Sequence, residues 1–190
     1  MEVVGLTGNI GAGKSTVANV FVALGIPVFN SDLEAKKAYT IPTIQNEVKT
    51  ILGIEIDFSK DSWKSEIASI IFSNVEKRLR LEKLIHSYVQ DKFIQWKSIQ
   101  TSKYIIREAA LADSFQPENC DWLIVVEANS ETRLQRVILR SGFTKEEFNK
   151  RDALQHRNES YPSNKIFTIS NNDNDRILAE TLKIHAQLTA

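Results

Sequence analysis

The sequence predicts an α/β fold in which a five-stranded parallel sheet is flanked by helices. Short apolar runs alternate with segments of helical periodicity along the 190 residues, which is typical of strand–helix–strand units. A glycine-rich turn joins the first apolar run to the first helical segment. The run at 122–126 is apolar throughout, as expected of a strand that helices cover on both faces. The expected strands lie at 3–6, 27–29, 103–106, 122–126 and 165–169.

Composition limits the classes of protein to consider. Hydrophobic residues make up 42% of the chain, enough for one domain with insertions. Lys+Arg and Asp+Glu are both 24, so we expect no nucleic-acid partner and no anionic membrane surface. The single Cys120 excludes an internal disulfide and suits a reducing compartment. No apolar stretch approaches the roughly 18 residues of a membrane span, and the first run is too short for a signal peptide, so we expect a cytoplasmic protein, by default a monomer.

The first apolar run leads into residues 8–15, which match the P-loop pattern G-x-x-x-x-G-K-[ST] between a strand and a helix. The glycines permit positive φ and let backbone amides point at a phosphate chain, to which the helix adds its N-terminal dipole. Lys14 is expected to bind the β and γ phosphates, and the Ser15 hydroxyl is expected to hold Mg²⁺. An ordinary glycine-rich turn is the alternative interpretation. The residues expected to hold ATP here are Gly11, Ala12, Gly13, Lys14, Ser15 and Thr16.

The segment after the P-loop places an acid at the end of the second strand. Val17, Phe21 and Leu24 lie on one helical face, and Gly25 then ends the helix. The strand at 27–29 follows, so Asp32 lies at the carboxyl edge of the sheet, where ligands bind in open α/β folds. Asp32 is expected to act as a general base or as an outer-shell Mg²⁺ ligand, and an N-cap for the next helix is the structural alternative.

Residues 61–100 have helical periodicity and are expected to form a substrate-binding insertion. The core is then 1–60, 101–132 and 162–190. A break at Ser73 separates two apolar stripes, and the second one runs from Leu81 to Trp96 at spacings of three and four. His86 follows an apolar stripe position, where a lone histidine is more often packing or surface than chemistry.

Charged side chains recur after the later strands. Glu108 and Glu127 each follow an apolar run, where a carboxylate can face a nucleotide-bound metal or simply end a strand in solvent. Arg133, Arg136 and Arg140 share one helical face, which is either a solvated basic face or a set of clamps for a phosphoryl group.

The segment 141–158 is charged and poor in large apolar residues, so we expect it to stay out of a dry core. This composition suits a mobile lid, and the lid region is expected to span 133–161. After the fifth strand, a polar loop at 171–175 leads to a last amphipathic helix through Ile177, Leu178, Leu182 and Leu188.

A GTPase must be considered, because residues 149–152 read N-K-x-D, the guanine-binding pattern. The match lies in a charged helical segment rather than after an apolar strand. The D-x-x-G switch motif is also absent from the sequence. We therefore interpret the match as accidental and favour a small P-loop kinase with a substrate-covering insertion and a basic lid.

The chain resembles the dephospho-CoA kinase family. The resemblance rests on the block at 5–18, Gly25 and Pro27 ahead of 30–32, Leu81-Glu82 with His86, residues 132–137 with Arg140, Gln155 and Asn171-Asn172. It implies a P-loop NTPase fold and transfer of the ATP γ-phosphoryl group to the ribose 3′-hydroxyl of dephospho-CoA, the last step of coenzyme A biosynthesis.

The resemblance also implies roles for single residues. Asp32 is similar to the catalytic aspartate that accepts the hydroxyl proton and assists Mg²⁺. Lys14 and Arg140 complete the catalytic set, Arg140 as the lid arginine on ATP. Arg136 and the turn at Asn171 contact ATP, the latter near adenine. His86 and Glu108 are expected with Asp32 on the substrate side.

Two departures from the family pattern leave alternatives open. Asn30 stands where the family has an aspartate, and Ala109-Ala110-Leu111 stands where the family has Pro-Leu-Leu. One alternative is a P-loop kinase for another small acceptor, such as a nucleoside monophosphate. The other is an ATP-binding module that has lost catalysis.

Overall fold

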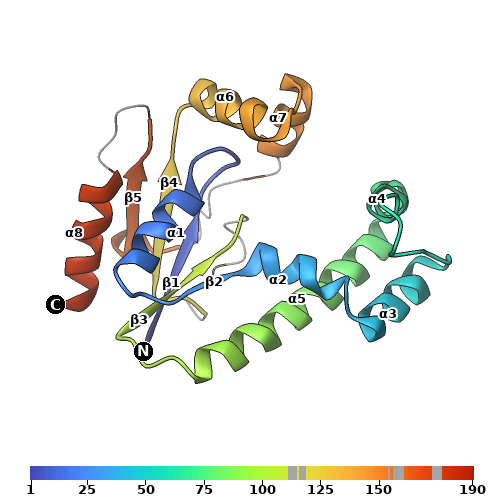
Figure 1. The fold of residues 1–190 in the computed structure, drawn as a ribbon, viewed down its shortest axis with the longest axis horizontal. Coiled ribbons are helices and arrows are strands. Elements are labelled where there is room, and N and C mark those ends of the chain that lie inside the picture. The colour runs from blue at the N-terminus through green and yellow to red at the C-terminus, as the bar shows by residue number, and fades with distance from the viewer. Residues whose placement is uncertain (111–114, 116–118, 154, 156–160, 173–176) are drawn as a thin grey trace. The chain divides into compact units, whose positions relative to one another are not determined.

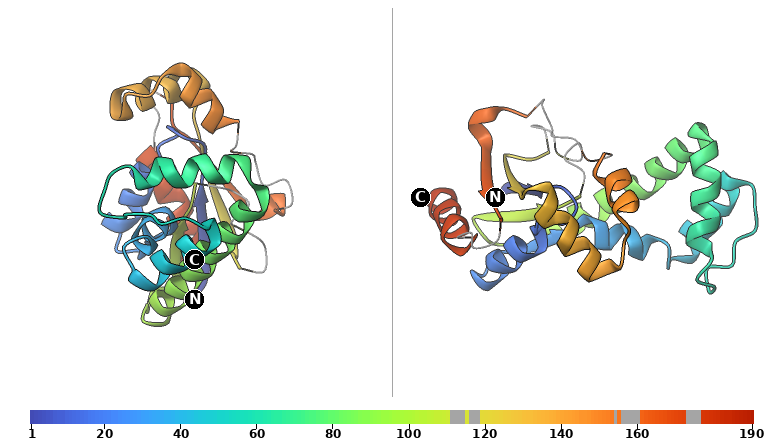
Figure 2. Two further views of the ribbon diagram at one scale, coloured as in Figure 1. Left: turned by 90° about the vertical axis from the view of Figure 1, so that its right-hand side faces the viewer. Right: turned by 90° about the horizontal axis from the view of Figure 1, so that it is seen from above.

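The computed structural model describes residues 1–110, 115, 119–153, 155, 161–172 and 177–190. The chain divides into two compact units, and Figures 1 and 2 show the elements of each. One unit comprises residues 1–30 and 99–190 and contains the sheet, and the other comprises 31–98. The helical unit thus begins at residue 31, earlier than the start at 61 that we expected for the insertion.

The sheet unit contains five parallel strands, as the sequence predicts. They are β1 (Glu2–Thr7), β2 (Val28–Asn30), β3 (Tyr104–Glu108), β4 (Trp122–Glu127) and β5 (Ile166–Ser170). Their order in the sheet is β2-β3-β1-β4-β5. The β2–β3 register pairs Asn30 with Glu108, so two polar side chains meet at the carboxyl edge.

One face of the sheet packs against α1 (Lys14–Ala23) and α8 (Ile177–Thr189). Phe21 of α1 and Ile184 of α8 share a buried cluster with Val4 and Leu6 of β1. The stripe expected on α8 was partly wrong. The helix buries Thr181, Ile184 and Leu188, whereas Leu178 and Leu182 are exposed. The i, i+3, i+7 set that faces the sheet includes a threonine, which a purely apolar pattern misses.

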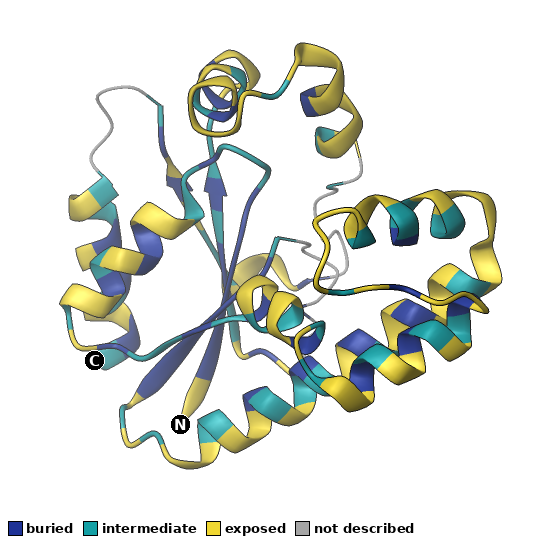
Figure 3. Ribbon diagram, turned by 45° about the vertical axis from the view of Figure 1, so that its right-hand side comes forward, coloured by how far each residue is buried: buried dark blue, intermediate teal, exposed yellow. Residues whose placement is uncertain are grey.

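Two helices follow β4, namely α6 (Ser130–Ser141) and α7 (Lys145–Asp152). Asn129 caps α6 by accepting a hydrogen bond from the Thr132 amide, and α6 ends at Gly142 with φ 65°. Thr144 and Glu147 form a capping box at the start of α7. Figure 3 shows α7 as mainly exposed, with a buried position on one side. A short 3₁₀ helix at Ser163–Lys165 precedes β5.

The helical unit contains α2 (Ser31–Ala38), α3 (Pro42–Leu52), α4 (Trp63–Ser73) and α5 (Val75–Ser98). Its α5 buries the expected stripe of Leu81, Ile85, Val89 and Phe93. Helix α3, which has Pro42 in its first turn and Gly53 as its C-cap, was not predicted from the sequence. Among the described residues, no helix is both long and apolar enough to cross a membrane.

Candidate active site

The P-loop has the backbone shape that its glycines predict. Gly11 and Gly13 have φ 79° and 96°, and α1 begins directly after Gly13. A Cβ atom on Gly13 would lie 2.0 Å from the side-chain amide nitrogen of Asn171, so both the positive φ and the lack of space require glycine here. The side chain of Asn171 is buried and donates a hydrogen bond of 2.6 Å to the Ala12 carbonyl. Asn171, on the loop after β5, therefore supports the P-loop through this hydrogen bond.

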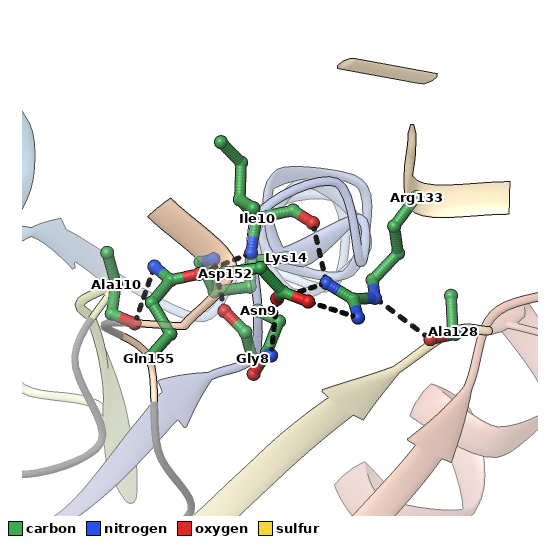
Figure 4. Close-up of polar contacts among 9 residues, drawn as sticks. All are labelled: Gly8, Asn9, Ile10, Lys14, Ala110, Ala128, Arg133, Asp152 and Gln155. Atoms are coloured by element: carbon green, nitrogen blue, oxygen red, sulfur yellow. Dashed lines mark hydrogen bonds and ion pairs between the residues drawn. The ribbon is translucent and has the colours of Figure 1, made fainter. Parts of the chain in front are cut away.

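The expected phosphate-binding lysine is folded onto its own loop. Lys14 Nζ donates a hydrogen bond of 2.5 Å to the Gly8 carbonyl, as Figure 4 shows. An ammonium group in this position lies over the loop, at the N-terminus of α1, where the helix dipole also favours anions.

Glu108 reaches the P-loop serine. Its side chain is buried and accepts hydrogen bonds from Ser15 Oγ (3.3 Å) and Asn30 Nδ2 (2.8 Å). The other strand-end acid, Glu127, is only partly buried, and its carbonyl accepts the Asn171 amide at 2.7 Å. Of the two glutamates that sequence reasoning left open, Glu108 therefore shares the site with Ser15. Hydroxyl and carboxylate oxygens are the ligand types that suit Mg²⁺.

The three arginines of α6 have different environments. Arg133 has a side chain only 9% exposed, and it forms an ion pair with Asp152. Arg136 Nη1 donates to the Asn171 carbonyl at 2.8 Å. Arg140 is exposed, with Nε 3.5 Å from Ser141 Oγ. Both interpretations of the arginine row, a solvated basic face and a set of phosphoryl clamps, are wrong for Arg133, because its charge is buried and paired within the protein.

Contacts of Arg133 with Asp152 and Phe148 anchor helix α7. The Arg133 guanidinium lies 5.4 Å from the ring centre of Phe148, which is 1% exposed. We expected the segment 141–158 to avoid a dry core, and Phe148 shows this to be wrong for α7, since one aromatic residue suffices to dock a short helix. Hydrogen bonds from Arg133 hold the pKa of Asp152 below its usual range. Because Asp152 accepts from Arg133 through both oxygens, the N-K-x-D tetrapeptide does not offer an uncommitted carboxylate to guanine.

Two contacts at the P-loop were not expected from the sequence. Asn9 Nδ2 donates to Asp152 at 2.7 Å, and Gln155 Oε1 accepts the Ile10 amide at 2.5 Å. Gln155 also donates to the Ala110 carbonyl at 3.4 Å. A cavity of about 250 Å³ beside the loop is lined by residues that include Asn9, Ala12, Glu127, Arg133 and Gln155. The remaining part of the expected lid, at 154 and 156–160, lies outside the described residues, as does the part of the polar loop at 173–175.

The other expected site residues belong to the helical unit. Asp32 is exposed in the first turn of α2. Since α2 already includes Ser31, Asp32 is not the N-cap of that helix. His86 is exposed on α5, beside the buried Ile85. The structure thus gathers Lys14, Ser15, Glu108, Arg136 and Asn171 in the sheet unit, while Asp32 and His86 lie on helices of the other unit.

Known proteins resemble this chain over most of its length. The family model described as CoaE, dephospho-CoA kinase, matches residues 2–176. The dephospho-CoA kinase of Bacteroides fragilis is 30% identical over 188 residues, which cover 97% of this chain and 92% of the relative. The dephospho-CoA kinase of Porphyromonas gingivalis is 31% identical over 162 residues, covering 84% and 80%.

Solved structures share the fold. TT1252 from Thermus thermophilus superposes with a TM-score of 0.86 at 28% identity, covering 100% of this chain and 98% of that one. The dephospho-CoA kinase from Campylobacter jejuni has a TM-score of 0.62 at 20% identity, covering 98% and 96%, and shows the same fold. The P-loop places its serine beside a strand-end glutamate, and the family model spans nearly the whole chain. The chain therefore belongs to the dephospho-CoA kinase family.

Proposed function

We propose that this protein transfers the γ-phosphoryl group of ATP to the ribose 3′-hydroxyl of dephospho-CoA, the last step of coenzyme A biosynthesis. The observation that carries the proposal is the contact of Ser15 with Glu108 at a P-loop, in a chain that the family model matches from residue 2 to residue 176. This contact supports a site for a metal-bound triphosphate beside the carboxyl edge of the sheet.

The P-loop residues supply positioning and charge. Amides of residues 11–16 surround the phosphates, and Lys14 exchanges the Gly8 carbonyl for the β and γ phosphate oxygens. Ser15 would hold Mg²⁺, which would supply positive charge beside the phosphates, and Glu108 orients the Ser15 hydroxyl. The side-chain amide of Asn30 donates to Glu108 and orients its carboxylate, so a neutral residue at position 30 still supports the site.

The remaining residues act on ATP and the acceptor. Asp32 accepts the proton of the attacking hydroxyl and assists Mg²⁺, and His86 contacts the acceptor. Arg136 and Arg140 contact ATP, with Arg140 acting on the transferring group. The turn at Asn171 contacts adenine, and the Asn171 side chain supports the P-loop through its hydrogen bond to Ala12.

A coupled assay of ADP formation tests the reaction. Purified protein with ATP, Mg²⁺ and dephospho-CoA should form ADP, and removal of Mg²⁺ with a chelator should stop it. A faster reaction with a nucleoside monophosphate would contradict the acceptor assignment while keeping the kinase. ATP binding by calorimetry without turnover on any acceptor would instead identify an inactive module.

The role of Asp32 is tested by Asp32→Asn. A lost general base lowers kcat by about 10²–10⁴-fold, whereas KM for ATP should change little because the carboxylate acts in the transition state. Glu47→Gln, at an exposed position on α3 in the same unit, is the matched control and should leave both constants unchanged. Turnover at the wild-type rate in Asp32→Asn would remove this residue from the mechanism.

A further inference from the structure

An ion pair between the buried Arg133 and the partly buried Asp152 ties the helices after β4 to the phosphate loop. Arg133 donates to both oxygens of Asp152, at 2.5 and 2.9 Å, and also to the carbonyl of Ala128. The side chain of Asp152 is 22% exposed, and one of its oxygens accepts Asn9 Nδ2 as well. Asp152 on α7 therefore binds a loop side chain directly, 143 positions away in the chain.

Both backbone groups of Ile10 are also held from this side. Its amide donates to Gln155, and its carbonyl accepts from Arg133 Nη1 at 3.4 Å. A Cβ atom on Gly11 would lie 2.6 Å from the Arg133 carbonyl, so the loop also abuts the backbone of α6. The first half of the phosphate loop thus rests on α6, α7 and Gln155, as Figure 4 shows for the polar contacts.

Asp152 is the member of this group on which the others depend. A guanidinium as buried as that of Arg133 is costly unless its charge is compensated, and Asp152 is its ion-pair partner. Without that carboxylate, the Arg133 guanidinium is more stable if it turns toward solvent. The Ile10 carbonyl then loses Arg133, and the Asn9 side chain loses Asp152. A loop that must form its phosphate-binding shape anew binds less tightly than a preorganised one.

We propose that Asp152 is a positioning residue for phosphoryl transfer, which acts through Arg133 and Asn9 to hold the phosphate loop ready for nucleotide. The inference rests on the proposed function only in that this loop binds ATP, so its test uses nucleotide binding and needs no acceptor.

The first experiment measures binding of ADP with Mg²⁺ by calorimetry. Asp152→Asn should weaken binding about tenfold, equivalent to about 1.4 kcal/mol. Glu146→Gln, at an exposed position on the same helix, should leave it unchanged. Wild-type affinity in Asp152→Asn would overturn the positioning role, whereas failure of the wild-type protein to bind would overturn the proposed function itself. In steady-state kinetics, Asp152→Asn should raise KM for ATP and leave KM for dephospho-CoA unchanged.

A second experiment separates positioning from stability. Replacing the pair together, as Arg133→Met with Asp152→Leu, removes both buried charges and should recover thermal stability relative to Asp152→Leu alone. ADP affinity should stay low in this double variant, because the Asn9 side chain and the Ile10 carbonyl still lack the partners that Asp152 and Arg133 supply. Recovery of affinity along with stability would show a purely structural role.

A double-mutant cycle tests the direct contact with the loop. If Asp152 acts through Asn9, the combined variant Asn9→Ala with Asp152→Asn should bind ADP about as weakly as the worse single variant. Strictly additive losses would contradict the coupling.

Discussion

At the scale of single residues, Gly13 is set by two independent constraints. Its φ of 96° disfavours any L side chain, and the Asn171 amide nitrogen occupies the space of a Cβ atom. Gly13→Ala should therefore lower the melting temperature and weaken ADP binding, because Asn171 must withdraw from Ala12. Gly25→Ala is the matched control, since its φ is 78° and no described atom lies within 4 Å of a Cβ there. The control should lose about 1–2 kcal/mol of stability without loss of affinity. Equal affinities for the two variants would show that the Asn171 contact is irrelevant to the loop.

Glu108 allows a sharper test at the same scale. Glu108→Gln keeps the shape but removes the charge next to Ser15, so the Mg²⁺ concentration needed for half-maximal activity should rise several-fold. Glu127→Gln, at the end of β4 and separated from β3 in the sheet by β1, should leave the Mg²⁺ requirement unchanged. A titration of activity with Mg²⁺ at saturating ATP compares the two. The same requirement in both variants would argue against Glu108 as part of the metal site.

The residues that sequence reasoning found and missed differ in one physical respect. Gly11 to Ser15 are contiguous, so local geometry alone predicts their joint role at the phosphate site. The contacts of Asn9 with Asp152 and of Ile10 with Gln155 join positions 143 and 145 apart. Such pairs depend on how α6 and α7 dock, which no local pattern in one sequence records.

At the scale of elements, periodicity predicted most of the helices and strands whose buried faces are apolar. The five strands and the α5 stripe follow from it, whereas α3 was missed although its Ile44, Val48 and Leu52 form a regular stripe. Composition misled for α7, because seven of its eight residues lie outside the core and Phe148 alone is buried. The average composition of a segment does not reveal a single buried residue that anchors it.

Helix α7 should respond to the loss of that anchor as a local unit. Phe148→Ala removes a ring that is 1% exposed and in contact with Arg133. Truncation of a buried Phe costs about 3–5 kcal/mol in a core, which exceeds what a capping box of about 1 kcal/mol retains in an eight-residue helix. Hydrogen exchange should therefore accelerate in α7 and leave β1 and β4 protected. Lys145→Ala, exposed on the same helix, is the control. Uniform loss of protection across the sheet would instead place Phe148 in the global core.

At the scale of the whole molecule, the sheet unit buries a cysteine thiol and two tyrosine hydroxyls that are neutral in the folded state. Burial raises the pKa of Cys120, Tyr104 and Tyr161. Cys120 accepts the Gly5 amide and donates to the Trp122 carbonyl, so its thiol links β1 to the start of β4. Tyr161 donates to the Cys120 carbonyl at 2.7 Å, and Tyr104 hydrogen-bonds with His185. These groups ionise more readily in the unfolded chain, so stability is fully present below their ordinary pKa values and falls as pH rises above about 8.5 for Cys and about 10 for Tyr.

Tyr161→Phe separates the hydrogen bond of this tyrosine from its ionisation. At pH 7.5 the variant should be less stable than wild type by about 1–3 kcal/mol, because the Cys120 carbonyl loses a buried donor. Above pH 10 the deficit should shrink by up to about 1.4 kcal/mol per pH unit, since the variant has no phenol to ionise on unfolding. Urea unfolding at intervals from pH 7.5 to 11 measures both effects in one series, with the neutral end as the internal reference. A deficit that stays constant across this range would mean that Tyr161 ionises equally in the folded and unfolded states, and that burial in the sheet unit does not set its pKa.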